Sequence, residues 1–161
     1  MRTVSAIVLM LLVGLLSHAA DKPKDEAKLL AAIEKAGVKV KNDASDSEPS
    51  RWKLSLPKWD PIKLSLLKGS PQVVEIVVED SSKVTDQTMT LFASLPNLEK
   101  LELFKPSLTA SGLNSFKNHK KLKSLTLFDA KVGDIAVANL KDVQTLEELD
   151  LTGTLITNQA A

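Results

Sequence analysis

The chain has 161 residues, of which 43% are hydrophobic and 25% charged, a size and composition typical of one ordinary globular domain. Its 21 basic residues nearly balance its 20 acidic ones, so an extended basic surface for nucleic acid is not expected. The absence of cysteine excludes disulfides, thiolate metal sites and a cysteine nucleophile.

The first 19 residues have the pattern of a secretory signal peptide. Arg2 is followed by an apolar run from Val4 to Leu16, and then Ser17 and Ala19 fit the small-x-small rule for signal peptidase. The apolar run has about 13 residues, whereas a membrane-spanning helix needs roughly 20, so a retained membrane anchor is the less favoured interpretation. We therefore predict cleavage after Ala19, no stable membrane insertion of the mature chain, and export to the periplasm or the cell exterior.

Residues 20–72 are expected to form an N-terminal cap on the remainder of the chain. Helix-forming residues with apolar side chains at helical spacing predict a helix over 24–36. Alternation of apolar and polar residues predicts short strands over 38–40 and 51–56, and a further short helix is expected over 62–68. A stack of repeats leaves the hydrophobic end of its first unit open, so we expect this region to cover that end.

The two tryptophans of this region have two conceivable roles. Trp52 and Trp59 could form an aromatic platform for a ligand, or they could seal the cap as large apolar side chains. We favour sealing, because large apolar side chains in a small domain are usually buried.

The stretch from Leu98 to Thr145 consists of two copies of one 24-residue unit. Six apolar positions recur without a gap: Leu98, Leu101, Leu103, Leu108, Leu113 and Phe116 correspond to Leu122, Leu125, Leu127, Val132, Val137 and Leu140. The pattern extends downstream to Ile156 with the same spacing, and upstream to Val73 if one residue is inserted between Val78 and Val84. This predicts three whole units and one truncated unit over residues 73–161. A single unit buries too few side chains to fold alone, so neighbouring units must stack.

Each unit begins with the pattern LxxLxL, in which the second and third leucines point to the same side of a strand. A column of residues suited to helix N-capping comes after it and predicts a short helix or helical turn in each unit: Thr85, Thr109, Gly133 and Thr157. A second column holds small residues, which we expect to let each helix lie close to the sheet: Thr88, Gly112, Ala136 and Ala160.

Units of LxxLxL followed by a helix resemble leucine-rich repeats. The segment LTGTLITNQAA is similar to the ribonuclease-inhibitor-like and cysteine-containing class of such repeats, which carries a Thr-x-Ile-Thr signature and is common in exported bacterial proteins. The resemblance covers residues 73–161 and implies an α/β leucine-rich repeat solenoid, with a short parallel β-sheet on the concave side, helices on the convex side and an α+β N-terminal cap. The chain departs from the family in two ways. The column where many members place Asn holds Pro106, Ala130 and Thr154, and the last unit lacks its helix.

No constellation of catalytic residues is visible in the sequence. His119 lies in the segment Asn-His-Lys-Lys, which we expect to be a solvated turn without a positioned partner for proton transfer. No serine occupies a GxSxG turn, and neither a glycine-rich phosphate loop nor a calcium loop is present. Capping and turn formation explain the acidic residues at the junctions between units, which are Asp80, Asp86, Asp129 and Asp134. We therefore expect a protein that is not an enzyme and that has no cofactor and no metal site.

Residues between the inward-pointing leucines are predicted to form rows on the concave face. The three rows are Glu75, Lys100, Ser124 and Glu148; Val77, Glu102, Thr126 and Asp150; and Glu79, Phe104, Phe128 and Thr152. Because adjacent strands lie about 4.8 Å apart, Phe104 and Phe128 should stand side by side.

This aromatic pair, rimmed by Glu102, Lys105 and Asp129, is typical of a small interaction surface. We hypothesise that the concave face binds a protein or peptide, with contacts from Phe104, Phe128, Glu102, Thr126, Lys100 and Asp150. The alternative is that the two rings only pack on each other.

A hypothesis of a different class is self-assembly as a structural envelope component. The final predicted strand, around residues 147–151, would end the parallel sheet with unpaired backbone groups. Another copy of the chain could pair with it and form a homo-oligomer.

Overall fold

The computed structural model describes residues 22–43 and 49–160. The predicted signal peptide and most of the loop before the second strand lie outside the described residues. Among those described, no helix is both long and apolar enough to cross a membrane.

The described chain is an α/β structure with a six-stranded sheet whose strand order follows the sequence. The strands are β1 (Lys39–Asn42), β2 (Trp52–Leu56), β3 (Val73–Val78), β4 (Lys100–Phe104), β5 (Ser124–Phe128) and β6 (Glu148–Asp150). Strand β1 pairs with β2 in antiparallel orientation, and strands β2 to β6 are all parallel. Parallel neighbours require crossover connections, and helical segments supply them here.

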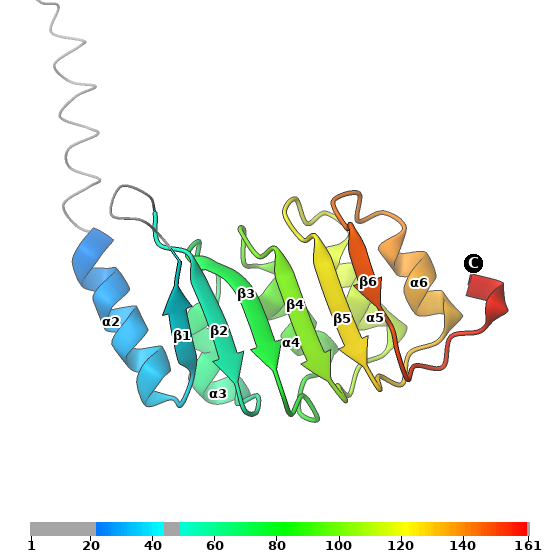
Figure 1. Cartoon of the computed structure of the whole chain (residues 1–161), viewed down its shortest axis with the longest axis horizontal. Helices are drawn as coiled ribbons and strands as arrows, with labels where there is room; N and C mark the ends of the chain where they lie inside the picture. The colour runs from blue at the N-terminus through cyan, green and yellow to red at the C-terminus, as the bar shows by residue number, and fades with distance from the viewer. Residues whose placement is uncertain (1–21, 44–48, 161) are drawn as a thin grey trace, which may run out of the picture.

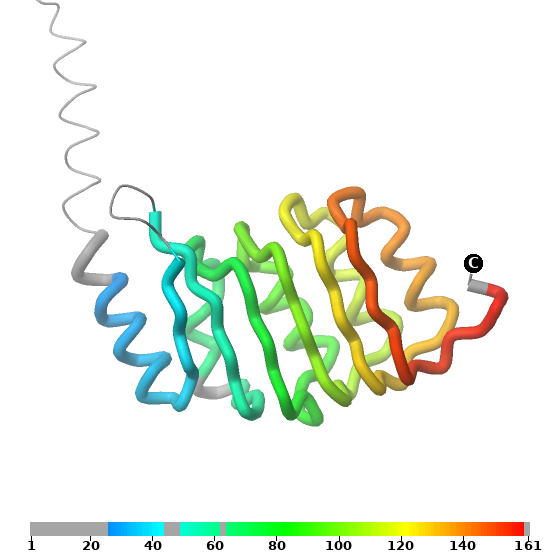
Figure 2. The backbone as a smooth tube through the Cα atoms, in the orientation of Figure 1, coloured from blue at the N-terminus to red at the C-terminus, as the bar shows by residue number. Residues whose placement is uncertain are grey.

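Helices α3 (Pro61–Leu64), α4 (Asp86–Ala93), α5 (Ala110–Leu113) and α6 (Asp134–Leu140) lie on one face of the sheet and leave the other face open, while α2 (Lys22–Lys35) lies at the end of the sheet beside β1 (Figure 1). The 3₁₀ turns are η1 (Ser65–Leu67), η2 (Asn114–Phe116) and η3 (Asn158–Ala160). Figure 2 shows the backbone passing repeatedly from the sheet to the helical layer and back, while α2 lies beside β1 at the other end of the molecule from α6. We call the face of the sheet opposite the helices the open face.

The helices and strands predicted within residues 20–72 are present with small differences in their boundaries. The helix predicted over 62–68 is divided into α3 and η1, because Leu64 has a backbone at φ −100° and ψ 0° that leaves the α-helical region. The last unit, from β6 onward, has only the 3₁₀ turn η3 in the place of a helix.

One continuous apolar core runs between the sheet and the helices from Ile33 to Val143. The paired leucines of the two central LxxLxL patterns point into it, since Leu101, Leu103, Leu125 and Leu127 are all fully buried, whereas Leu149 of the last pattern is 37% exposed. Trp52 and Trp59 are also buried, and the Trp59 ring packs edge-on against Phe92 with 4.8 Å between ring centroids. The favoured interpretation of the tryptophans as sealing side chains is therefore confirmed.

Candidate functional site

The open face carries the predicted rows of side chains in the predicted register. Lys100 pairs with Ser124, which pairs with Glu148, and in the next row Glu102, Thr126 and Asp150 are aligned. Phe104 is directly opposite Phe128 at the carboxyl ends of β4 and β5. This alignment results from the constant spacing of the leucines, since a shift of one residue would turn them away from the core.

Charged and hydroxyl groups along the first two rows are joined to one another. Lys100 Nζ lies 2.7 Å from Glu102 Oε1, and the Ser124 hydroxyl donates to Glu148 Oε2 at 2.8 Å. The bond with Glu102 raises the pKa of Lys100, an effect that partial burial opposes and the negative charges of Glu102, Glu75 and Glu148 support. Lys100 therefore remains a cation under all ordinary conditions.

Asp150 is the last residue of the second row, and it accepts hydrogen bonds from Thr152, two residues further along the chain. The hydroxyl and the backbone N–H of Thr152 both donate to Asp150 Oδ1, at 2.6 and 2.9 Å. These two bonds, the hydroxyl first, lower the pKa of Asp150. Asp150 is accordingly ionised at neutral pH.

Phe104 and Phe128 form an aromatic pair on the open face. Their ring centroids are 5.8 Å apart and the rings are tilted by 42°. Both side chains are only half-buried, so each ring keeps an accessible side. Rings at this separation attract each other, and the accessible sides remain free to contact a third group.

The backbone turns sharply just after each of these phenylalanines. Lys105 and Asp129 both adopt the left-handed conformation, with φ of 58° and 54°. The turns are held by backbone hydrogen bonds between units, such as Lys105 N–H to the Phe128 carbonyl at 2.8 Å. Beside these turns lies an open hollow of about 530 Å³ that Lys105, Asp129 and Lys131 line. The hollow adds charged groups to the end of the sheet that carries the aromatic pair.

The six predicted contact residues lie on one face of the sheet but do not form a single compact cluster. Phe104, Phe128, Glu102 and Thr126 are neighbours, and Asp150 comes after Thr126 across the sheet. Lys100 lies four residues before Phe104 on the same strand, which is roughly 13 Å away. Lys131 was not anticipated, because it lies beyond the strand and no strand periodicity places it.

His119 is not in a solvated turn, so that prediction is wrong. The side chain is 9% exposed, and its Nε2 lies 2.9 Å from the Leu95 carbonyl. Its Nδ1 accepts hydrogen bonds from the backbone N–H groups of Lys121 and Leu122 at 3.2 and 3.0 Å. The ring therefore joins two consecutive units as a structural group, with the proton on Nε2.

The expected role of the junction carboxylates in capping and turn formation is confirmed at Asp80, whereas Asp86 and Asp134 bond to a threonine of the next unit instead. Asp86 accepts from the Thr109 N–H and hydroxyl at 2.8 and 2.6 Å, and Asp134 accepts from the same groups of Thr157, both at 2.7 Å. Each of these two bonded pairs connects the first residue of one helix to the capping residue of the next unit. Asp80 accepts from the Ser82 N–H at 3.1 Å in a local turn.

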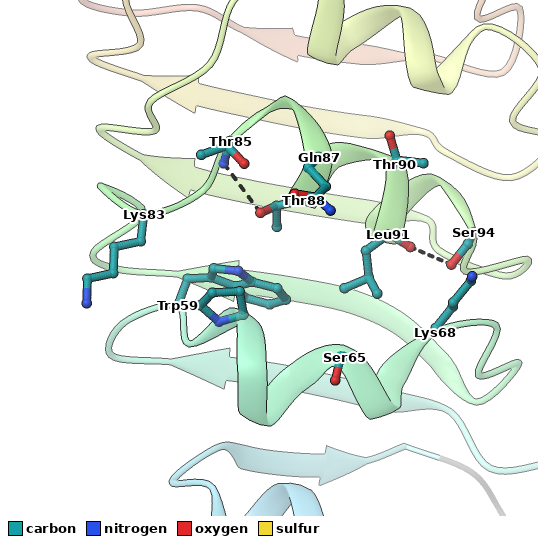
Figure 3. A pocket seen from close by; sticks show the side chains of 11 residues that line it. Trp59, Ser65, Lys68, Lys83, Thr85, Gln87, Thr88, Thr90, Leu91 and Ser94 are labelled. Carbon is teal, nitrogen blue, oxygen red and sulfur yellow. Dashed lines mark hydrogen bonds between the residues drawn. The ribbon is translucent and has the colours of Figure 1, made fainter.

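A groove lies on the helical side, between the segment of α3 and η1 and the helix α4 (Figure 3). It has a volume of about 540 Å³, and its lining includes Trp59, Lys68, Lys83, Thr88 and Ser94. Trp59 Nε1 has no hydrogen-bond partner among the described residues, but the atom is shielded from solvent. A ligand in the groove could therefore bond to Trp59 Nε1 only if side chains moved to expose that atom.

Within residues 22–43 and 49–160, no group of three or more His, Asp or Glu side chains is arranged to hold a metal ion. Comparison with known proteins gave no family model that matches the chain and no significant match among curated proteins.

Proposed function

We propose that this chain is an exported leucine-rich repeat protein without catalytic activity, which binds a protein or peptide through the open face of its sheet. The observation that carries the proposal is the half-buried pair of Phe104 and Phe128, aligned on neighbouring strands. Partner recognition commonly relies on a few aromatic anchors with charged groups around them, and Glu102, Lys105 and Asp129 supply such groups here.

Several structural features support the repeat assignment. The left-handed residues Lys105, Asp129 and Gly153 are spaced by 24 residues, as are the first residues of β4, β5 and β6. The same bond between the first residue of a helix and the next capping threonine is present at two junctions, Asp86 with Thr109 and Asp134 with Thr157, while the junction between them has Ala110 and Gly133 instead. The proposed solenoid would consist of stacked copies of this unit, with the region before β3 as its cap.

The test compares two double variants in the native cell envelope. A photo-crosslinking residue at Thr126 lies beside the aromatic pair and captures whatever contacts the open face. We expect Phe104→Ala/Phe128→Ala to lose the crosslinked product, because truncating two anchors typically weakens binding by more than tenfold.

The matched control removes apolar side chains from elsewhere on the surface. Ile135 and Leu155 are 72% and 66% exposed, so Ile135→Ala/Leu155→Ala leaves the open face unchanged and should retain the product. Circular dichroism would verify that both variants are folded. Capture of the same partner by the folded phenylalanine variant would contradict the proposal.

A further inference from the structure

Strand β6 is an exposed edge of the sheet. All three of its residues are exposed, and among residues 22–43 and 49–160 no strand pairs with its outer side. The Glu148 N–H donates to the Lys123 carbonyl at 2.9 Å, so Glu148 and Asp150 direct their backbone groups toward β5. Because backbone groups alternate along a strand, the N–H and C=O of Leu149 point outward and are available to a further strand.

The side chains of β6 give this edge a distinct charge pattern. Glu148 and Asp150 lie on the open face, and Leu149 between them points toward the core side with 37% of its surface exposed. Their neighbours on β5 are the hydroxyl residues Ser124 and Thr126. An added strand would therefore meet two carboxylates on one side of the sheet and an apolar side chain on the other.

Two carboxylates elsewhere on the open face, Glu75 and Glu102, have basic partners. Glu75 lies 3.7 Å from Lys53 on the next strand, and Glu102 lies 2.7 Å from Lys100. In the described part of the chain, neither Glu148 nor Asp150 forms such an ion pair, and hydroxyl groups are their hydrogen-bond donors. The acidic charge at the edge is thus not held in an ion pair, and the cation that acts on Glu148 from a distance, Lys100, lies two strands away and is bonded to Glu102.

The charges oppose the simplest form of self-assembly. Two copies of β6 in antiparallel pairing would place Glu148 opposite Asp150 twice, and like charges directly opposite each other are destabilising. Strand β1 has the complementary pattern of Lys39, Val40 and Lys41, but α2 lies beside that strand (Figure 1). A second copy could offer β1 only by displacing α2.

We propose that the outer edge of β6 binds a strand of a different protein in which Lys or Arg residues alternate with an apolar residue. Main-chain hydrogen bonds to Leu149 would supply the pairing, and the two carboxylates would select the basic sequence. The site is separate from the aromatic pair, since Phe128 lies at the carboxyl end of β5.

The test uses two synthetic peptides and the full chain. The basic probe is Val-Lys-Val-Lys-Asn, the sequence of residues 38–42, and the matched control replaces both lysines by glutamate. Binding is followed by the amide chemical shift of Leu149 in NMR titrations. Two cross-strand ion pairs give about 2- to 30-fold relative to a neutral peptide, and repulsion weakens the glutamate control further, so we expect the basic peptide to bind at least about 2- to 30-fold more tightly than the control.

A charge-reversed variant of the protein tests whether charge, and not another difference between the two peptides such as strand propensity or solubility, determines the preference. In Glu148→Lys/Asp150→Lys the preference should invert toward the glutamate peptide, and circular dichroism would verify the fold. Equal binding of both peptides, or shifts that fall away from β6, would overturn the proposal. Light scattering that shows concentration-dependent association of the wild-type chain would also overturn it, in favour of a second copy.

Discussion

Removal of the His119 side chain should destabilise the fold substantially. His119→Ala removes the partners of the Leu95 carbonyl and of the backbone N–H groups of Lys121 and Leu122. Lys121 is exposed, so water can replace its lost bond, whereas Leu95 and Leu122 are fully buried. Each buried group left unsatisfied costs about 1–3 kcal/mol, so we expect a loss of about 2–6 kcal/mol in the free energy of unfolding.

Urea unfolding followed by circular dichroism measures this loss. Two further variants separate the contribution of the Nδ1 acceptor from that of the Nε2 donor. The side-chain oxygen of His119→Asn can take the place of Nδ1 as acceptor, while the side-chain amide of His119→Gln can reach the position of Nε2 as donor. Each should recover part of the stability that alanine loses. If the free energy of unfolding of His119→Ala is within about 0.5 kcal/mol of the wild-type value, the hydrogen-bonded role of this ring is refuted.

Contacts between units give two more predictions. An added Cβ at Gly112 would lie 2.5 Å from Asp86 Oδ1 and 3.2 Å from Asp86 Cα. Although alanine favours helices, Gly112→Ala should therefore lower the free energy of unfolding by about 1–3 kcal/mol in urea titrations. A gain in stability would contradict this close packing. The Thr157 hydroxyl is the main cause of the lowered pKa of Asp134, so Thr157→Val should raise that pKa toward 3.8 in a carboxyl NMR titration. A lowered folded-state pKa stabilises above the unfolded-state value, so the stability difference between Thr157→Val and wild type should be present above pH 3.8 and fade as the pH falls.

The sheet and its register could be predicted because each strand position is determined by burial. Leu101 and Leu125 are fully buried partners, and the residues between such leucines must then face the other way. The same register places Phe104 opposite Phe128, as the structure shows. Periodicity is strong evidence when the same face is buried in every unit.

The polar contacts between units were harder to predict. The environment of His119 depends on the Leu95 carbonyl, 24 residues earlier in the chain, and its neighbours Asn118, Lys120 and Lys121 are hydrophilic. Local composition therefore indicated a solvated turn, although the ring is buried by the preceding unit. A single exceptional residue in one unit gives no periodic signal.

The small-residue column illustrates a partly correct inference. Gly112 was expected to bring its helix close to the sheet, but a Cβ there would meet Asp86 of the neighbouring helix α4. The pattern correctly indicated close packing, whereas its partner depended on how adjacent helices are offset. Thr109 donates two hydrogen bonds to Asp86 across this offset, and no local sequence pattern predicts bonds between residues 23 positions apart.

The turns just after the aromatic pair allow stability and binding to be separated. Lys105 has φ of 58°, a conformation that costs a residue with a Cβ about 1–2 kcal/mol, and the equivalent position of the last unit is Gly153 with φ of 76°. Glycine removes that cost but loses more chain entropy on folding, so Lys105→Gly should be about 1 kcal/mol more stable than Lys105→Ala in urea unfolding. Both variants lack the charged group that lines the hollow, so both should reduce partner capture at Thr126 equally. If capture instead tracks stability, and the glycine variant binds as well as the wild type, then Lys105 has no part in recognition.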